Sequence, residues 1–290
     1  MLKVRSNVEL GHPRIDSDYC DPSEAIVMSS NSGGDFIFFA GGIGHNYGGV
    51  PCEIELQFPN STPNVVRSSI PGSSIKWRWD NDEETNRDIK PRMDVGLYDT
   101  LIISGNASDY YIATYPTRPW NTEYTEIWTR HYWDNAKSGA GGGKTFLIGT
   151  HAGLNRPDYL GECRHRHWVF KKQMDGLNID RNPQHPRVRV IPAYLAYQRY
   201  FEDKQSNNLP YPTFFEDLFE DNFHQNDTGK YTYLCMYMAT LFGVDPRNIT
   251  PQPVGLTALT VQESEYIRQV CYEVLKTTEV HGINTLAWDN

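Results

Sequence analysis

Short, nearly continuous apolar runs alternate along the chain with longer segments whose apolar residues recur at helical spacing. A short run of this kind is typical of a strand that is buried on both faces of a parallel sheet. On this criterion the sequence predicts strands at residues 35–40, 64–70, 99–104, 144–150 and 187–192. Helical segments are expected between and after them, at residues 51–58, 121–137, 161–175, 193–203 and 213–219.

The clearest helix begins near residue 260. Thr260 and Glu263 have the spacing of a capping box, in which each side chain binds the backbone N–H group of the other residue. The apolar residues that follow lie on one side of the expected helix: Tyr266, Ile267, Val270 and Val274. This stripe predicts a helix that covers the core near the C-terminus.

Strands that alternate with helices predict an α/β fold, with a central parallel sheet and helices on both faces. Residues 1–34 are expected to form an N-terminal arm, although residues 1–33 are also compatible with a strand and a loop. Residues 35–250 would form the α/β domain, and residues 251–290 a C-terminal helix and tail packed on it. In such sheets, ligands bind beyond the carboxyl ends of the strands.

Composition narrows the functional classes. The chain has 290 residues and a net charge of −9, with 39% hydrophobic and 13% aromatic residues. It can build a sizeable core, and its acidic balance argues against a nucleic-acid partner. No apolar stretch is long enough to predict a membrane span, so no membrane partner is expected. The N-terminal residues lack the apolar core of a secretion signal, which favours the cytoplasm or a virion or other assembly.

The cysteines are scattered without the paired spacing of a zinc site, and their odd number argues against a complete disulfide framework. They are Cys20, Cys52, Cys163, Cys235 and Cys271. Cys235 and Cys271 fall in helical patterns, where reduced and buried thiols are expected. We therefore expect neither a metal nor a cofactor.

The candidate chemistry lies just before an apolar helical run, where Asp221 and His224 stand three residues apart. A catalytic histidine needs one ring nitrogen held by a carboxylate or carbonyl, so that the other nitrogen can transfer protons. A single turn that carries both residues would fix their separation. The alternative is a helix entry with a solvated histidine and an acidic cap.

Four features, in this order, resemble the SGNH (GDSL-like) hydrolase family. They are a glycine-rich turn (41–49) after the first expected strand, Gly72 after the second, Gly105-Asn106 after the third, and Asp221-Asn222-Phe223-His224 near the C-terminus. The last block continues as N-x-x-G-x-Y (226–231) and F-G-x-D-P (242–246), which is similar to a bacterial SGNH-like branch. The resemblance spans residues 35–245 and implies a three-layer, flavodoxin-like sandwich.

The resemblance also implies roles for these residues. In the family, a serine of the first block attacks an ester carbonyl, a histidine takes its proton and an aspartate orients the histidine. Carried over, His224 is the base and Asp221 its orienting partner, while Gly72 and Asn106 donate hydrogen bonds to the oxyanion. Each such donor is worth roughly 3 kcal/mol in the transition state.

The first block departs from the family pattern, which has Gly-Asp-Ser or Gly-His-Ser directly after strand one. Here Ile43 or Asn46 stands at the nucleophile position, and no serine occurs between Gly33 and Asn60. Neither side chain can form an acyl-enzyme, and loss of a triad serine costs about a millionfold in rate. A nucleophile would have to come from elsewhere: Ser29, Ser30, Ser32, Ser73 or Ser74, or a water molecule activated by His224.

Four residues near these blocks are candidates for substrate binding: Gly42, His45, Ser73 and Trp77. His45 lies in the glycine-rich turn, where a merely exposed histidine is an equal alternative. Trp77 and Trp79 flank Arg78 and could form a platform for a sugar ring. Aromatic residues at this spacing nevertheless belong more often to a core.

Two functions from different classes remain. One is an esterase or deacetylase that acts on carbohydrate O-acyl groups, either through a nucleophile outside the expected position or with an activity much reduced by the missing serine; we expect little or no serine-type activity. The other is a catalytically inactive SGNH-fold module that binds an acylated glycan, or that contacts protein partners in an assembly such as a virion. The distance from His224 to any serine hydroxyl discriminates between them.

Overall fold

The computed structural model of the chain describes residues 24–29, 64–68, 75–82, 90–95, 100–104, 120–135, 143–222, 225–249 and 259–282. The strand expected at 35–40 and the helix expected at 51–58 lie outside these ranges.

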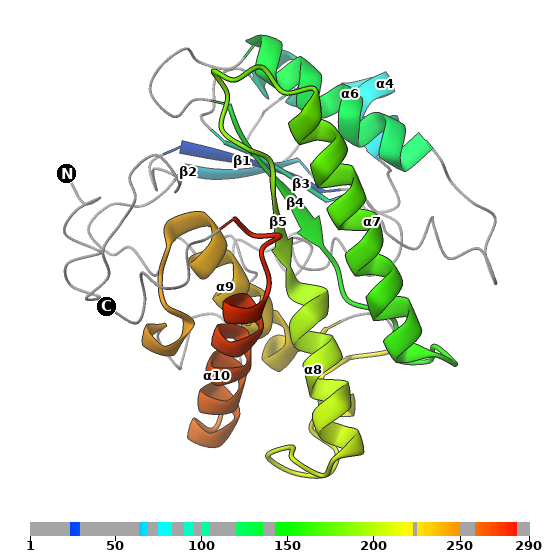
Figure 1. The fold of residues 1–290 in the computed structure, drawn as a ribbon, viewed down its shortest axis with the longest axis vertical. Coiled ribbons are helices and arrows are strands. Elements are labelled where there is room, and N and C mark those ends of the chain that lie inside the picture. Colours follow the sequence, from blue (N-terminus) through cyan, green and yellow to red (C-terminus); the bar gives the residue numbers. More distant parts are fainter. Residues whose placement is uncertain are drawn as a thin grey trace.

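The described strands form one parallel sheet of five. They are β1 (Glu24–Ser29), β2 (Asn64–Ser68), β3 (Thr100–Ser104), β4 (Lys144–Gly149) and β5 (Arg189–Pro192). The sheet order is β2-β1-β3-β4-β5, and every neighbouring pair is parallel (Figure 1). This is the flavodoxin-like order, in which the winding direction reverses between β1 and β3. The expected parallel α/β sheet is therefore confirmed, as are the strands predicted near 64–70, 99–104, 144–150 and 187–192.

The first described strand corrects the expected N-terminal arm. Glu24–Ser29 lies inside the sheet, where Ile26 pairs with Val66 of β2 and with Leu101 of β3. Its apolar run, residues 25–28, is shorter than the run at 35–40, so the pattern alone favoured the later segment. A strand and loop within residues 1–33 was the alternative, and the structure places a strand there.

Nine helical segments accompany the sheet in the described part of the chain. They are α4 (Ile75–Asn81), α5 (Pro91–Asp94), α6 (Trp120–Asn135), α7 (Tyr159–Ile179), α8 (Ala193–Gln205), η3 (Glu216–Leu218), α9 (Asp227–Phe242), η4 (Pro246–Asn248) and α10 (Val261–Thr277). The helix expected at 213–219 is only the short 3₁₀ segment η3, and residues 75–81 form a helix that was not among the expected segments. None of the described helices is long and apolar enough to cross a membrane.

Alternate residues of the strands face two separate hydrophobic clusters, as expected for a sheet covered on both sides. Ile102, Phe146 and Ile191 pack in one cluster with α8, α9 and α10. The neighbouring residues Leu101 and Leu147 pack in the other with α4, α6 and α7. The two clusters on opposite faces of the sheet make the three-layer α/β sandwich (Figure 1).

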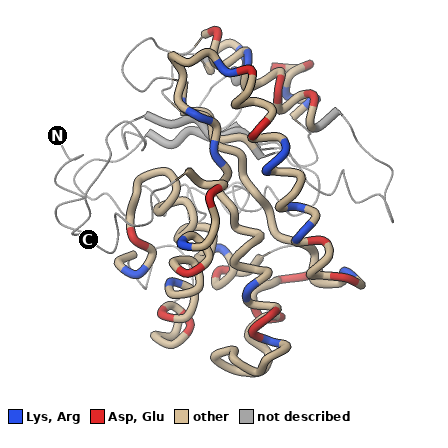
Figure 2. Tube along the Cα trace, viewed as in Figure 1, with Lys and Arg blue, Asp and Glu red and all other residues tan. Residues whose placement is uncertain are grey.

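Helix α9 is the most deeply buried of the described helices, because every residue from Gly229 to Phe242 is buried. A helix that is apolar on all sides has no solvent face, so it must lie between other layers. Asn226 caps its start by accepting from Gly229 N, and Gly243 ends it with a φ of 67°. That left-handed conformation is one that glycine adopts without a steric penalty. In contrast to the buried helix α9, the helices α7, α8 and α10 carry charged residues along their length (Figure 2).

Helices α4 and α6 meet through aromatic side chains. Trp128 Nε1 donates a hydrogen bond to Ile75 O at 3.0 Å, and the Trp79 ring contacts Trp128 edge to face at 5.0 Å. Trp79 therefore packs against the core, although both Trp77 and Trp79 are only half-buried on this helix. Residues two positions apart point in different directions on a helix, so Trp77 and Trp79 do not form a single flat platform for a sugar ring.

The chain after α10 returns to β5. Val190 N donates to Val280 O at 2.8 Å, and the neighbouring His281 ring is completely buried. Burial lowers the pKa of His281 to about 4, and the charge of Arg189 acts in the same direction.

The thiols of Cys163, Cys235 and Cys271 are buried and free, which confirms the expectation of reduced, buried thiols for Cys235 and Cys271.

Removing the N-terminal cap of α10 should weaken the protein. Thr260 Oγ1 accepts from Glu263 N at 3.1 Å, and Glu263 accepts from Thr260 N at 2.8 Å, so the predicted capping box is confirmed. Thr260→Ala should lower the free energy of unfolding by about 1 kcal/mol, measured by urea denaturation. Thr277→Ala, at the exposed far end of the same helix, should change it by less than about 0.5 kcal/mol. Equal effects of the two substitutions would contradict the role of the cap.

The stability of the protein should depend on the protonation of His281. Because its pKa is lower in the folded chain than in the unfolded chain, the unfolded state takes up a proton first as the pH falls. This contribution should lower the free energy of unfolding by roughly 2 kcal/mol between pH 7 and pH 4.5. His281→Gln should show a correspondingly shallower pH dependence of stability in urea titrations. Parallel profiles for the two proteins would show that His281 does not titrate in this way.

Candidate functional site

The site is built at the carboxyl edge of the sheet, where β4 continues into a well-packed loop. Thr150 and His151 directly follow the strand and are both buried. Arg166 of α7 holds this loop, because its Nη1 donates to Thr150 O at 3.1 Å and to Thr150 Oγ1 at 2.8 Å. The same guanidinium pairs with Glu162 at 2.8 Å, and Glu162 also pairs with Arg156 at 3.0 Å. A buried charge with well-placed partners favours one backbone arrangement of the loop.

His151 joins this loop to the segment that precedes α9. Its backbone N donates to Tyr233 Oη at 3.2 Å, and its Nδ1 lies 2.7 Å from the same hydroxyl. Gln225 Nε2 donates to the imidazole, 2.6 Å from Nδ1. The ring packs against Tyr197 and Phe219 at centroid distances of 4.8 and 5.5 Å. Residue 225, next to His224 in sequence, is therefore fixed against the carboxyl end of β4.

The turn that carries Asp221 is held from two sides. An antiparallel bridge joins Phe219 to Gln225, and Asn226 N donates to Leu218 O at 3.1 Å. Across the edge, Leu154 N of the β4 loop donates to Asn222 O at 2.7 Å. Asp221 is exposed at the tip of this turn. The backbone at Asp221 therefore lies at the sheet edge where parallel α/β proteins bind ligands.

The start of α9 approaches the turn closely at Gly229. A Cβ atom there would overlap the carbonyl oxygen of Leu218 and would lie 2.8 Å from Tyr197 Oη. Tyr197 Oη donates to Gly229 O at 3.2 Å, and burial raises the pKa of this tyrosine well above its usual value. The hydroxyl therefore stays protonated and remains a donor. Glycine at this position lets the first turn of α9 dock directly onto the segment that leads to Asp221.

The structure places only part of the sequence-predicted site. Asp221 lies at the carboxyl edge, and Trp77 lies on α4, which packs against α6 on the other cluster of the core. The remaining candidates lie outside the described residues: Gly42, Ile43, His45, Asn46, Gly72, Ser73, Asn106 and His224. In sequence, however, Asn106 follows the last residue of β3 by two positions and Gly72 follows the last residue of β2 by four.

Sequence reasoning missed the residues that position the turn. His151, Gln225 and Tyr233 come from a strand end, a turn and a helix that are far apart in sequence. One signal was present, since His151 is the second residue after β4, and polar residues at strand ends of parallel sheets often line a site.

Comparison with known proteins identifies a fold but no family. No protein-family model matches the chain, and a search of curated proteins gives no match. A crystal structure of a DUF4886 family protein from Bacteroides uniformis is similar, with a TM-score of 0.55 and 10% sequence identity. The similarity covers 87% of this chain and 95% of that one. At this identity the likeness shows the fold alone, and it agrees with the three-layer α/β architecture.

Two glycine substitutions should have opposite effects on stability. Gly229→Ala introduces a methyl group into a space that Leu218 and Tyr197 already occupy, and should destabilise the protein by about 1–3 kcal/mol. Gly176→Ala lies on the exposed side of α7 with no neighbouring atom within 4 Å, and should stabilise it by about 0.5–1 kcal/mol. Urea unfolding of both variants tests this. A neutral Gly229→Ala would mean that α9 does not dock so closely.

Proposed function

We propose that the protein is a serine hydrolase of the SGNH type that cleaves ester-linked acyl groups from carbohydrates. The observation that carries the proposal is the hydrogen bond from Leu154 N to Asn222 O, which fixes the Asp221 turn to the loop after β4. A carboxylate at the carboxyl edge of a flavodoxin-like sheet is where the family resemblance requires the orienting residue. His224 follows Asp221 by three residues and Gln225 is anchored to His151, which restrains the segment at both ends.

The position of β1 supports a nucleophile other than Ile43 or Asn46, the residues that the family resemblance put at the nucleophile position. The resemblance puts the nucleophile directly after strand one, and the first strand of the described sheet ends at Ser29. The sequence that follows is Ser30-Asn31-Ser32, so the first block is displaced from residues 41–46 to residues 30–32. We assign Ser32 to the nucleophile position, with Asn31 where the family has an acidic residue or histidine. A serine is then present in the first block, which favours an active enzyme over an inactive module.

The proposed reaction divides ester hydrolysis into two steps. Ser32 Oγ attacks the acyl carbonyl while His224 removes its proton, and the sugar hydroxyl leaves with that proton. Water then attacks the acyl-enzyme with His224 as the base, which releases the carboxylic acid and restores Ser32. Asp221 holds the imidazole in the productive tautomer. Gly72 N–H and the Asn106 side chain donate to the oxyanion in both steps.

Replacement of single serines tests the assignment. Wild-type protein should be labelled stoichiometrically by a fluorophosphonate probe and should hydrolyse p-nitrophenyl acetate and acetylated sugars. Ser32→Ala should abolish labelling and lower kcat/KM by at least about 10⁴-fold, because no other group can form the acyl-enzyme. His224→Ala should have a similar effect, and Asp221→Asn should lower kcat/KM by at least about a hundredfold. Ser30→Ala is the matched control and should keep both labelling and activity.

Other outcomes separate the alternatives. Labelling that maps to Ser73 or Ser74 would move the nucleophile to the segment after β2. A folded protein that is neither labelled nor active on any ester would contradict the enzyme proposal. The chain would then be better described as an SGNH-fold module for glycan binding or assembly. Thermal melting of each variant checks that lost activity does not reflect unfolding.

A further inference from the structure

A cavity lies at the opposite end of the molecule from the Asp221 turn. It has a volume of about 480 Å³ and forms where the chain leaves α7, turns and enters β5. Its walls include Arg181, His185, Arg187, Arg189 and Gly282. Helix α7 has 21 residues and begins beside the β4 loop, so its far end is about 30 Å from the carboxyl edge of the sheet. The cavity is therefore separate from the proposed active site.

The cavity is cationic although the whole chain carries a net charge of −9. Three arginines line it against one acidic residue, Glu279, and no ion pair joins Glu279 to these arginines within the described residues. Asp180, the acid next to Arg181 in sequence, pairs with Arg130 at 2.8 Å. Arg181 and Arg187 therefore have no acidic partner among the residues that the structure describes.

Two of the arginines have N–H groups that bind no acceptor in the described structure. Arg181 Nη1 donates to the backbone oxygens of Asn182 and His185, but its Nε is buried without a hydrogen-bond acceptor in the described structure. Arg187 is exposed and makes no hydrogen bond or ion pair with the residues that the structure describes. Because Arg181 Nε is buried, the exposed guanidinium of Arg187 is the group whose N–H donors are open to an anion that enters the cavity.

The walls of the cavity are held in place by neighbouring contacts. Asn178 of α7 exchanges two hydrogen bonds with the backbone of Val188, at 3.0 and 2.8 Å. The His185 ring stacks on Trp133 with a centroid distance of 5.7 Å and an interplanar angle of 11°. A Cβ atom on Gly282 would lie 2.9 Å from Arg189 Nε, so glycine leaves room for that side chain. A binding site with fixed walls loses little entropy when a ligand enters.

We propose that this cavity binds a small anionic ligand through a phosphate or carboxylate group. Guanidinium groups bind both groups with paired N–H donors, and they remain charged at all physiological pH values. The volume suits a small molecule rather than a single ion, since ligand cavities begin at about 300 Å³. The site does not depend on the proposed hydrolase activity, and the two can be tested independently.

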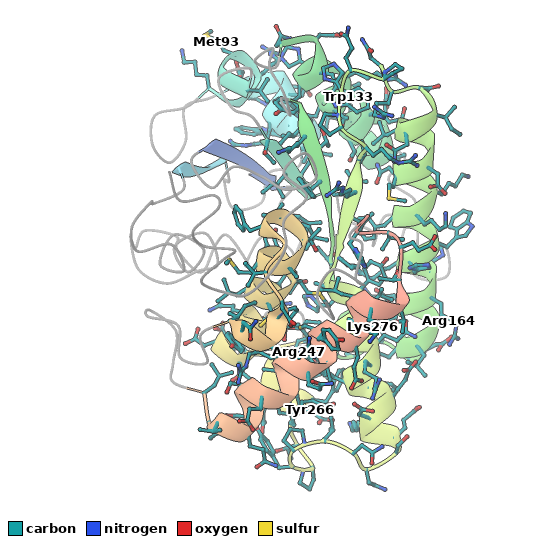
Figure 3. All side chains as sticks on the ribbon, turned by 60° about the vertical axis from the view of Figure 1, so that its left-hand side comes forward. Met93, Trp133, Arg164, Arg247, Tyr266 and Lys276 are labelled. Carbon is teal, nitrogen blue, oxygen red and sulfur yellow. The ribbon has the colours of Figure 1, made fainter. Side chains whose placement is uncertain are left out.

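Isothermal titration with sodium phosphate and, separately, sodium succinate tests the proposal, at constant ionic strength maintained with chloride. Wild-type protein should bind at least one of the two anions at a single saturable site. Arg187→Ala should weaken that binding at least tenfold, and Arg181→Gln should weaken it further. Arg164→Ala is the matched control, because Arg164 is an exposed arginine near the other end of α7, far from Trp133 (Figure 3). It should bind as the wild type does.

The outcomes decide the ligand class as well as the site. Binding of phosphate alone or of succinate alone identifies the preferred group. Failure of both anions to bind above the chloride background would overturn the proposal, as would an Arg187→Ala variant that binds as tightly as the wild type. Because Arg187 is exposed, its replacement should leave folding intact, so the result remains interpretable even if Arg181→Gln does not fold.

Discussion

The burial of α9 from Gly229 to Phe242 is the constraint on which the rest of the structure depends. A helix without a solvent face must bury its polar side chains as well as its apolar ones, and each buried polar atom then needs a partner. Tyr233 finds one in His151, and Thr232 lies 3.1 Å from Tyr200 Oη. The bond to His151 in turn ties α9 to the loop after β4. The Tyr233 hydroxyl therefore helps to fix the loop whose Leu154 N binds the Asp221 turn.

Much of the fold was predictable because parallel strands and capped helices leave local signals. The runs at 64–70 and 144–150 became strands, and the Thr260 capping box became the start of α10. The strand at 24–29 was assigned to an arm because only four apolar residues mark it. Its place inside the sheet comes from pairing with β2 and β3, which are distant in sequence. Such long-range pairing leaves no periodicity in the strand itself.

The candidate site was predictable only in part, for a related reason. Asp221 and His224 form a local motif, and local motifs can be found by spacing. The anchors of that motif, Leu154 and His151, lie about 70 residues earlier and contact it only after β4, α8 and α9 have packed. No pattern in the chain marks these contacts. They depend on tertiary packing, which also explains why buried Gly229 had no evident role before the structure.

Placing the first strand at residues 24–29 instead of 35–40 changes the candidate active-site residues more than it changes the fold. A parallel sheet with the same strand order can be built with residues 24–29 or residues 35–40 as its first strand, but the residues that follow the strand differ. After residues 35–40 come Gly41 and Gly42, whereas after residues 24–29 come Ser30, Asn31 and Ser32. Since side chains at the carboxyl ends of the strands line the site in this fold class, the choice of strand selects the candidate nucleophile. In the proposed hydrolase, the apparent lack of a first-block serine comes from taking residues 35–40 as the first strand, because the residues after 24–29 include Ser30 and Ser32.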